Sequence, residues 1–157
     1  MGIQVNIGDH TSSQAGYLAV PSGDKRYMCN WARIKARTIA RTIPSANVYF
    51  KTLPGGRTLT ELLADSTIWI NYQSTMTFYG QAVLSGTELA IGNSAFRKGR
   101  WTVVATLIHE LCHINGVPGG TDRRAEESLL HCGLGKQSER TNQVDDPNTP
   151  YEPGIEG

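Results

Sequence analysis

The sequence lacks a long apolar run, a strong net charge of either sign and a rich supply of cysteine. No stretch approaches the roughly 20 consecutive apolar residues that cross a bilayer as a helix, so we expect no membrane span. The net charge is +1 and only 18% of the residues are charged, which gives the chain no overall attraction for nucleic acid or membrane surfaces. Its 157 residues suffice for a single domain with a buried core.

Cysteine and the first residues carry little further information. The three cysteines, Cys29, Cys112 and Cys132, allow at most one disulfide bridge, and the sequence does not indicate which pair would form it. Cys112 is more typical of a small core residue than of a metal ligand. The opening residues, MGIQVNIGDHTSS, have neither a basic flank nor an apolar core. They therefore predict no cleavable signal peptide.

The most informative stretch is the HExxH pattern that runs from His109 through Glu110 to His113. On an α-helix, residues four apart differ by only about 40° in direction and lie about 6 Å apart along the axis. Both histidines can therefore bind one tetrahedral Zn²⁺ through an imidazole nitrogen. Glu110 points about 100° away from His109, so it cannot be a third ligand. It can instead act as the general base on a water molecule that zinc activates.

The residues around this motif predict a helix with a defined end. Apolar side chains recur at helical spacing from Val104 to Ile114, and the run from Trp101 contains neither Pro nor Gly before the motif. Gly116 can supply the left-handed residue that closes a helix, and the following Pro-Gly-Gly at 118–120 predicts a turn. We therefore interpret the motif as a metal site rather than as two incidental histidines on an exposed helix.

Two histidines and a water leave zinc one protein ligand short. A second helix, predicted over residues 123–131, offers Glu126, Glu127 and His131, and Asp122 just before it is a distant fourth candidate. Glu127 and His131 are four apart and share one face, whereas Glu126 shares its side with the leucines at 129 and 130. That apolar side should turn into the protein, so Glu126 is predicted to be the more buried carboxylate. The spacing itself leaves the choice of ligand open.

Residues 101–133 as a whole resemble a known group of enzymes. The pattern HELxHxNGxPGG, followed by AEExLLxCG, resembles the small bacterial zincin domains that are toxic C-terminal modules of polymorphic toxins and type VI secretion spike proteins. This resemblance implies a gluzincin-type zinc metallopeptidase with Glu126 as its third ligand. It also implies a protein, peptide or peptidoglycan substrate and a cognate immunity protein. Such a protein is made in the cytoplasm and delivered outside the cell or into a target-cell compartment.

The remainder of the chain predicts an α+β fold. The expected elements are a strand over 3–7, a long helix over 25–43, a strand over 48–50, a short helix from a capping box at 58–61, a hairpin over 67–72 and 75–84, and a strand over 89–91. Residues 136–157 predict an irregular tail to the single domain. The resemblance implies a zincin-like arrangement, with a small twisted sheet over the HExxH helix and the long N-terminal helix and second ligand-bearing helix beside it.

Two further parts of a peptidase site can be proposed. The resemblance implies an edge strand that pairs with an extended substrate, and we predict it within residues 88–96, ELAIGNSAF; the alternative is an interior hairpin strand. Its candidate residues are Leu89, Ala90, Ile91 and Asn93. A donor that stabilises the oxyanion is also needed, and Tyr72, Tyr79 and His131 each carry a suitable group. The sequence does not choose among them.

Two other functions remain compatible with the sequence. The first is a metal-binding module without catalysis, in which four protein ligands close the site. Binding of both Glu126 and His131 to zinc would be its mark. The second is a toxin that binds nucleic acid through the basic residues of the helix over 25–43. A solvated helix face is the more typical role of such residues in a chain of balanced charge, so nucleic acid is the less favoured partner.

Overall fold

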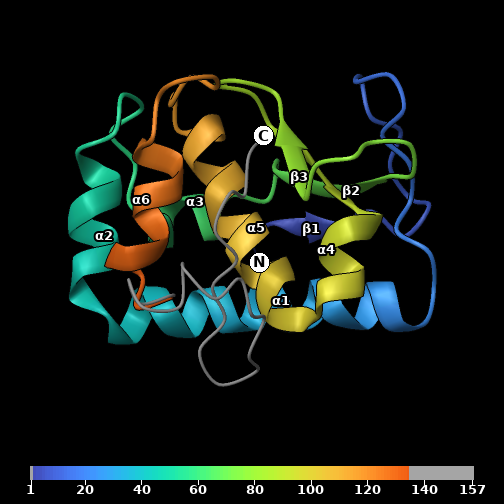
Figure 1. Ribbon diagram of the computed structural model, residues 1–157, viewed down its shortest axis with the longest axis horizontal. Helices are drawn as coiled ribbons and strands as arrows, with labels where there is room; N and C mark the ends of the chain where they lie inside the picture. The colour runs from blue at the N-terminus through green and yellow to red at the C-terminus, as the bar shows by residue number, and fades with distance from the viewer. Residues whose placement is uncertain (1, 135–157) are drawn as a thin grey trace.

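The computed structural model describes residues 2–134, and the predicted tail over 136–157 lies outside the described residues. The described residues form an α+β fold with one four-stranded mixed sheet and six helices (Figure 1). The predicted fold class is confirmed at this level. In chain order the elements are β1 (Gln4–Val5), α1 (Asp24–Thr42), α2 (Pro44–Lys51), α3 (Leu59–Leu63), β2 (Trp69–Gln73), β3 (Gly80–Ala82), β4 (Glu88–Gly92), α4 (Asn93–Lys98), α5 (Arg100–Ile114) and α6 (Arg124–His131).

The strands are arranged in the order β1-β2-β4-β3. β1 and β4 both run parallel to β2, and β3 runs antiparallel to β4. The prediction that residues 88–96 provide the edge strand is therefore wrong, because β4 is an interior strand. A strand that is paired on both sides and covered on both faces exposes no side chain to solvent. All five residues of β4 are buried. The residues proposed to face a substrate are thus placed elsewhere: Leu89, Ala90 and Ile91 are 0% exposed, and Asn93 begins α4.

Two other strand predictions are also wrong. The hairpin over 67–72 and 75–84 does not form, because β2 and β3 both pair with β4 rather than with each other. β3 and β4 are the two strands that form an antiparallel pair, with a turn that includes Ser85 at a φ of 55°. The strand predicted over 48–50 lies inside α2. Pro44 stands in the first turn of α2, where its fixed φ favours a helix, and Ala46 and Phe50 bury their side chains one turn apart.

Helices α1, α3, α5 and α6 are close to their predicted positions, whereas α2 and α4 contain residues that were predicted as parts of strands. α1 buries Ala32, Ala36 and Ile39 at helical spacing, whereas Tyr27 and Ile34 are each 59% exposed. The capping box at the start of α3 is present with both of its hydrogen bonds. None of the described helices combines the length and the apolarity that crossing a membrane requires. All three cysteines are buried and unbridged.

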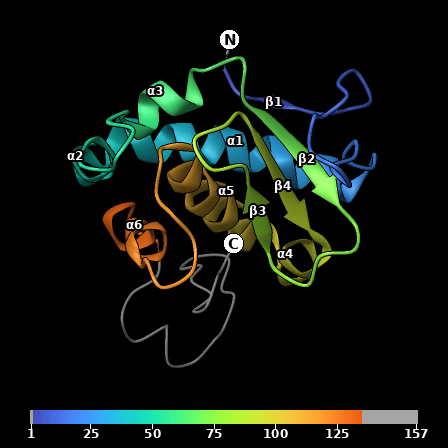
Figure 2. The same ribbon diagram turned by 90° about the horizontal axis from the view of Figure 1, so that it is seen from above.

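Helix α5 forms the centre of the packing. It contacts α1, α4, α6, β3 and β4, and every residue from Thr102 to Ile114 is buried. Figure 2 shows α5 between α6 on one side and β3 on the other. α2 and α6 lie together at the end of the molecule away from the sheet in both views. The HExxH motif is therefore held by an element that packs on nearly every side.

Candidate metal centre

The two histidines of the motif point their outer ring nitrogens at each other. His109 and His113 lie one turn apart in the last part of α5, and their Nε2 atoms are 3.2 Å apart. Two nitrogens bound at about 2.0–2.1 Å to a tetrahedral zinc ion are about 3.3–3.4 Å apart. The pair is therefore already close to the spacing that a shared zinc ion requires. Both side chains are almost fully buried, at 4% and 5% exposure.

The end of α5 fixes the orientation of His113. The chain leaves the helix at Asn115 and turns at Gly116, whose φ of 90° is accessible to glycine without strain. This turn places the carbonyl oxygen of Val117 2.7 Å from His113 Nδ1. Since a carbonyl oxygen can only accept, Nδ1 carries the proton, and Nε2 presents its lone pair to the site. The backbone therefore selects the metal-binding tautomer.

His109 is held neutral by its surroundings. Burial, and to a smaller extent the neighbouring His113, lower the pKa of His109 to about 3. Its Nδ1 atom is buried and has no hydrogen-bond partner among the described residues. A neutral imidazole is the form that binds a metal ion.

Glu110 is a fully buried carboxylate without a partner. Both of its carboxylate oxygens are enclosed, and neither accepts a hydrogen bond from any residue that the structure describes. Burial raises the pKa of Glu110 well above its usual range. An unpaired buried carboxylate is costly unless some other group compensates it. Its place directly beside the histidine pair fits a carboxylate that holds a water molecule next to a metal ion.

Strand β3 reaches this carboxylate through Gly80. A Cβ atom on Gly80 would contact the methyl group of Thr106 and lie 2.9 Å from Glu110 Oε1. The strand can approach α5 this closely only because residue 80 has no side chain. Within the described residues, β3 is also an edge of the sheet. The strand that borders the candidate site is therefore β3 rather than β4.

A cavity of about 240 Å³ opens over the two histidines. Its other walls are Phe78, the turn over 119–122 and the start of α6, including Glu126. The Glu126 side chain is only 13% exposed and accepts a hydrogen bond from Arg123 Nη2 at 3.3 Å. Glu127 is exposed. The prediction that Glu126 is the more buried of the two carboxylates is thus confirmed, and α6 brings it to the same cavity as the histidines.

The third ligand remains a prediction. Over residues 2–134, no three His, Cys, Asp or Glu side chains converge closely enough to hold a metal ion together. The possible donors that line the cavity are the two histidines and the carboxylates of Glu126 and Asp122. Asp122 is already paired with Arg124 at 2.6 Å, so Glu126 is the better candidate. Two imidazoles and one carboxylate are a donor set that catalytic zinc sites use. The histidines fit zinc as they stand, and Glu126 would complete the set by a change in its side-chain conformation.

Other residues named from the sequence are engaged elsewhere. The ring of His131 stacks on Tyr49 with centroids 4.1 Å apart, on the α2 side of α6. The Tyr72 hydroxyl donates to Asn93 Oδ1 at 2.7 Å. Neither of these two side chains lines the cavity over the histidines, and neither does Glu127 or Tyr79 among the described residues. The structure therefore leaves the oxyanion donor unassigned.

Sequence reasoning missed one side chain near Glu110. Tyr17 is buried, and its hydroxyl donates to Gln81 Oε1 of β3 at 3.2 Å. Burial, and then the nearby carboxylates of Glu110 and Glu88, raise the pKa of Tyr17. Tyr17 therefore stays protonated, and its hydroxyl bonds to a side chain of β3. It lies in a turn-rich segment without a motif, so no pattern in the sequence indicates this position.

The chain was compared with family models, curated proteins and solved structures. None of the three comparisons gives a match.

Proposed function

We propose that this chain is a zinc-dependent metallopeptidase of gluzincin type, in which His109 and His113 bind the metal, Glu126 completes the ligand set and Glu110 is the general base. The observation that carries the proposal is the pair of converging Nε2 atoms, 3.2 Å apart, beside a buried carboxylate that has no partner in the described residues. A structural metal site needs no such carboxylate, whereas hydrolysis needs a group that accepts a proton.

The proposed chemistry divides into what zinc supplies and what the chain supplies. Zinc, when bound, supplies a Lewis acid for a carbonyl oxygen and lowers the pKa of water toward about 7. Glu110 accepts the proton from the attacking water and passes it to the leaving amine. The burial of Glu110 makes its carboxylate a stronger base than an exposed one, because burial disfavours the charged form.

An extended peptide would lie along β3. Within residues 2–134 this short strand has β4 on one side only. Unpaired backbone groups on such an edge can form main-chain hydrogen bonds with an added strand. Since Gly80 contacts Glu110, a peptide paired with β3 would run past the general base and the two histidines.

The resemblance noted in the sequence extends the proposal to biology. We propose that the chain is an effector or toxin domain, delivered by a secretion machine, that acts on bacterial or host targets. Its substrate would be a protein or the peptide cross-links of peptidoglycan. A neighbouring immunity protein would then protect the producing cell.

Zinc content and hydrolysis together test the proposal. The purified protein should bind about one zinc ion per chain, and His109→Ala or His113→Ala should lose most of it, because two remaining ligands bind far more weakly. Glu110→Gln should keep the zinc but lower cleavage of fluorescent casein or of purified peptidoglycan by at least about 100-fold. Glu127→Gln is the matched control, because it removes an exposed carboxylate from α6 and should leave both measurements unchanged.

Two outcomes would contradict the proposal. If the double histidine variant still binds zinc, the metal site does not lie on α5. The second outcome combines two observations: the histidine variants lose zinc, but hydrolysis or toxicity is identical in wild type and Glu110→Gln. The chain would then be a metal-binding module without the proposed catalysis.

A further inference from the structure

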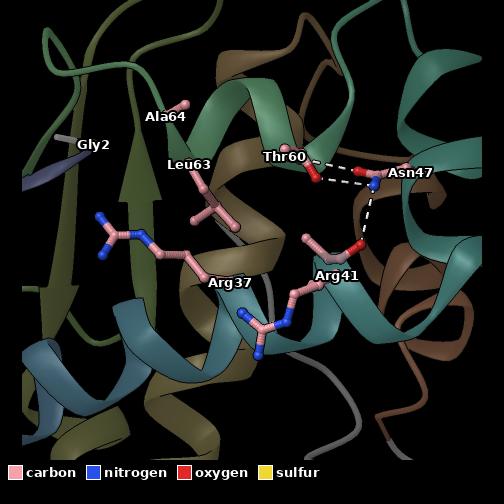
Figure 3. Close-up of a pocket in the computed structure, with 8 residues that line it drawn as sticks. Gly2, Arg37, Arg41, Asn47, Thr60, Leu63 and Ala64 are labelled. Atoms are coloured by element: carbon pink, nitrogen blue, oxygen red, sulfur yellow. Dashed lines mark hydrogen bonds between the residues drawn. The ribbon is translucent and has the colours of Figure 1, made fainter.

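A second, larger cavity lies on a different part of the molecule. It has a volume of about 590 Å³ and shares no lining residue with the cavity over the histidines. Its walls come from the second half of α1, from α2 and from α3, together with Gly2 next to β1 (Figure 3). Sites for small organic ligands have volumes of this order, about 300–1,000 Å³.

Two arginines give this cavity its charge. Arg37 and Arg41 are four residues apart on α1, so they lie on the same face of the helix about one turn apart. Figure 3 shows the Arg37 side chain extending toward Gly2 and the Arg41 side chain lying apart from it along α1, with Leu63 facing the space between α1 and α3. Neither guanidinium has a hydrogen bond or an ion pair with any residue in the described part of the chain. The cavity is therefore lined by two positive charges that have no counter-charge among residues 2–134.

The other basic residues of α1 are engaged in the fold. Arg26 donates to the carbonyl oxygen of Val20 at 2.9 Å, and Arg33 donates to that of Ile3 at 2.9 Å. Lys25 and Lys35 lie over the rings of Phe96 and Trp101, with the ammonium 5.8 Å and 4.8 Å from the ring centroids. The basic helix is therefore not a continuous positive track of the kind that follows a nucleic-acid backbone. Its free charge is concentrated at the cavity.

The rest of the cavity combines an apolar floor with one polar wall. Leu63 and Ala40 form part of the floor and are themselves 2% and 6% exposed. On the polar wall, Asn47 Nδ2 donates to Thr60 Oγ1 at 2.9 Å and to the carbonyl oxygen of Ala40 at 3.1 Å, and Asn47 Oδ1 accepts from the backbone N–H of Thr60 at 2.9 Å. Because the Thr60 oxygen accepts from Asn47, the Thr60 hydroxyl proton can be donated to a ligand.

We propose that this cavity binds a small organic phosphate. The planar guanidinium forks of Arg37 and Arg41 match the oxygens of a phosphate group, to which arginine donates two parallel hydrogen bonds. Thr60 adds a neutral donor, and the floor at Leu63 and Ala40 accepts the apolar body that carries the phosphate. A free inorganic ion would use the arginines but not the floor. This site is independent of the proposed peptidase function, because none of its residues belongs to the metal centre.

Simple probes test the site on the whole chain. Phenyl phosphate should bind at least several times more tightly than inorganic phosphate, and phenol should not bind, because the phosphate and the ring each contact a part of the cavity. Arg37→Gln and Arg41→Gln should each weaken phenyl phosphate binding at least about tenfold. Arg97→Gln is the matched control: Arg97 is an exposed arginine of α4 with a weak 3.3 Å bond to Ser94, and its loss should change binding by less than about twofold.

Titration followed by ¹H–¹⁵N NMR gives both affinity and location. Shifts should concentrate at the amides of Arg41, Thr60 and Leu63 and should persist in the His113→Ala variant. Arg41 is exposed, so Arg41→Gln is expected to fold and keeps the test valid even if Arg37→Gln does not. The proposal is overturned by unchanged affinity in Arg41→Gln, by shifts elsewhere, or by no binding at millimolar probe. It is equally overturned if benzoate or a single-stranded oligonucleotide binds the same residues more tightly than phenyl phosphate, since the ligand class would then be a carboxylate or a nucleic acid.

Discussion

The close contact between β3 and α5 allows a sharp prediction for Gly80→Ala. The new methyl group would meet the Thr106 methyl and lie 2.9 Å from Glu110 Oε1 and 3.0 Å from Glu110 Cγ. Carbon atoms in good contact are about 3.5–4.0 Å apart, so the strand and the helix must separate by roughly 1 Å or more. Overpacking of this kind costs about 1–3 kcal/mol of unfolding free energy. A displacement of about 1 Å at a catalytic group can cost about 100-fold in rate.

A second substitution separates the two effects. Thr106→Ser removes the methyl group that the new Cβ would meet but leaves the contact with Glu110 in place. The double variant should therefore regain half or more of the lost unfolding free energy, as measured by urea denaturation, while hydrolysis stays low. Thr106→Ser alone is the control and closes the double-mutant cycle. The reasoning is refuted if Gly80→Ala unfolds within about 0.5 kcal/mol of the wild type and keeps its full activity.

Three further outcomes are expected. Glu126→Ala should weaken zinc binding at least about tenfold and Glu127→Ala by no more than a few-fold, as measured by competition with a chromophoric chelator; the reverse order would move the ligand to Glu127. Burial raises the pKa of Cys29 to about 12, so above about pH 8.5 the unfolded state loses the thiol proton first, and the unfolding free energy should fall by up to about 1.4 kcal/mol per pH unit. Cys29→Ala should make the unfolding free energy, measured in urea, depend less on alkaline pH. An unchanged dependence on pH would contradict the assignment. Asn115→Ala should lower the unfolding free energy by about 2–4 kcal/mol, because the buried Asn115 amide donates to the carbonyl oxygens of Phe50 and Arg57 and accepts from the Arg57 N–H. A thermal midpoint equal to that of the wild type would show that these bonds are replaceable.

Local sequence signals predicted four of the six described helices, α1, α3, α5 and α6. The repeat of small apolar residues in α1, the end of α5 at Gly116 and the capping box at Thr58 each depend on neighbours within one or two turns. The same holds for the histidine pair, whose convergence follows from a spacing of four residues on a helix. The greater burial of Glu126 relative to Glu127 also followed from the periodicity of α6.

The strand order could not be obtained in this way. β2 pairs in parallel with β1 and with β4, and neither is joined to it by a tight turn. The residues within a strand do not indicate which strand will be its neighbour. The segment Val48–Phe50 has strong strand formers, yet packing of Phe50 into the core and Pro44 at the helix start outweigh that preference. Gly80 carried a readable signal, since a glycine inside a strand pattern often marks close approach of another backbone.

The burial of α5 from Thr102 to Ile114 has a consequence for the dynamics of the candidate metal centre. Amide protons in such a helix exchange with solvent only when the whole domain opens, whereas amides of a half-exposed helix such as α6 exchange through local opening. The two histidines therefore belong to a helix that opens only when the whole protein unfolds. Glu126 belongs to a helix that can open locally. If zinc binds as proposed, its release should begin at α6, and the histidine pair should stay in place to bind another ion.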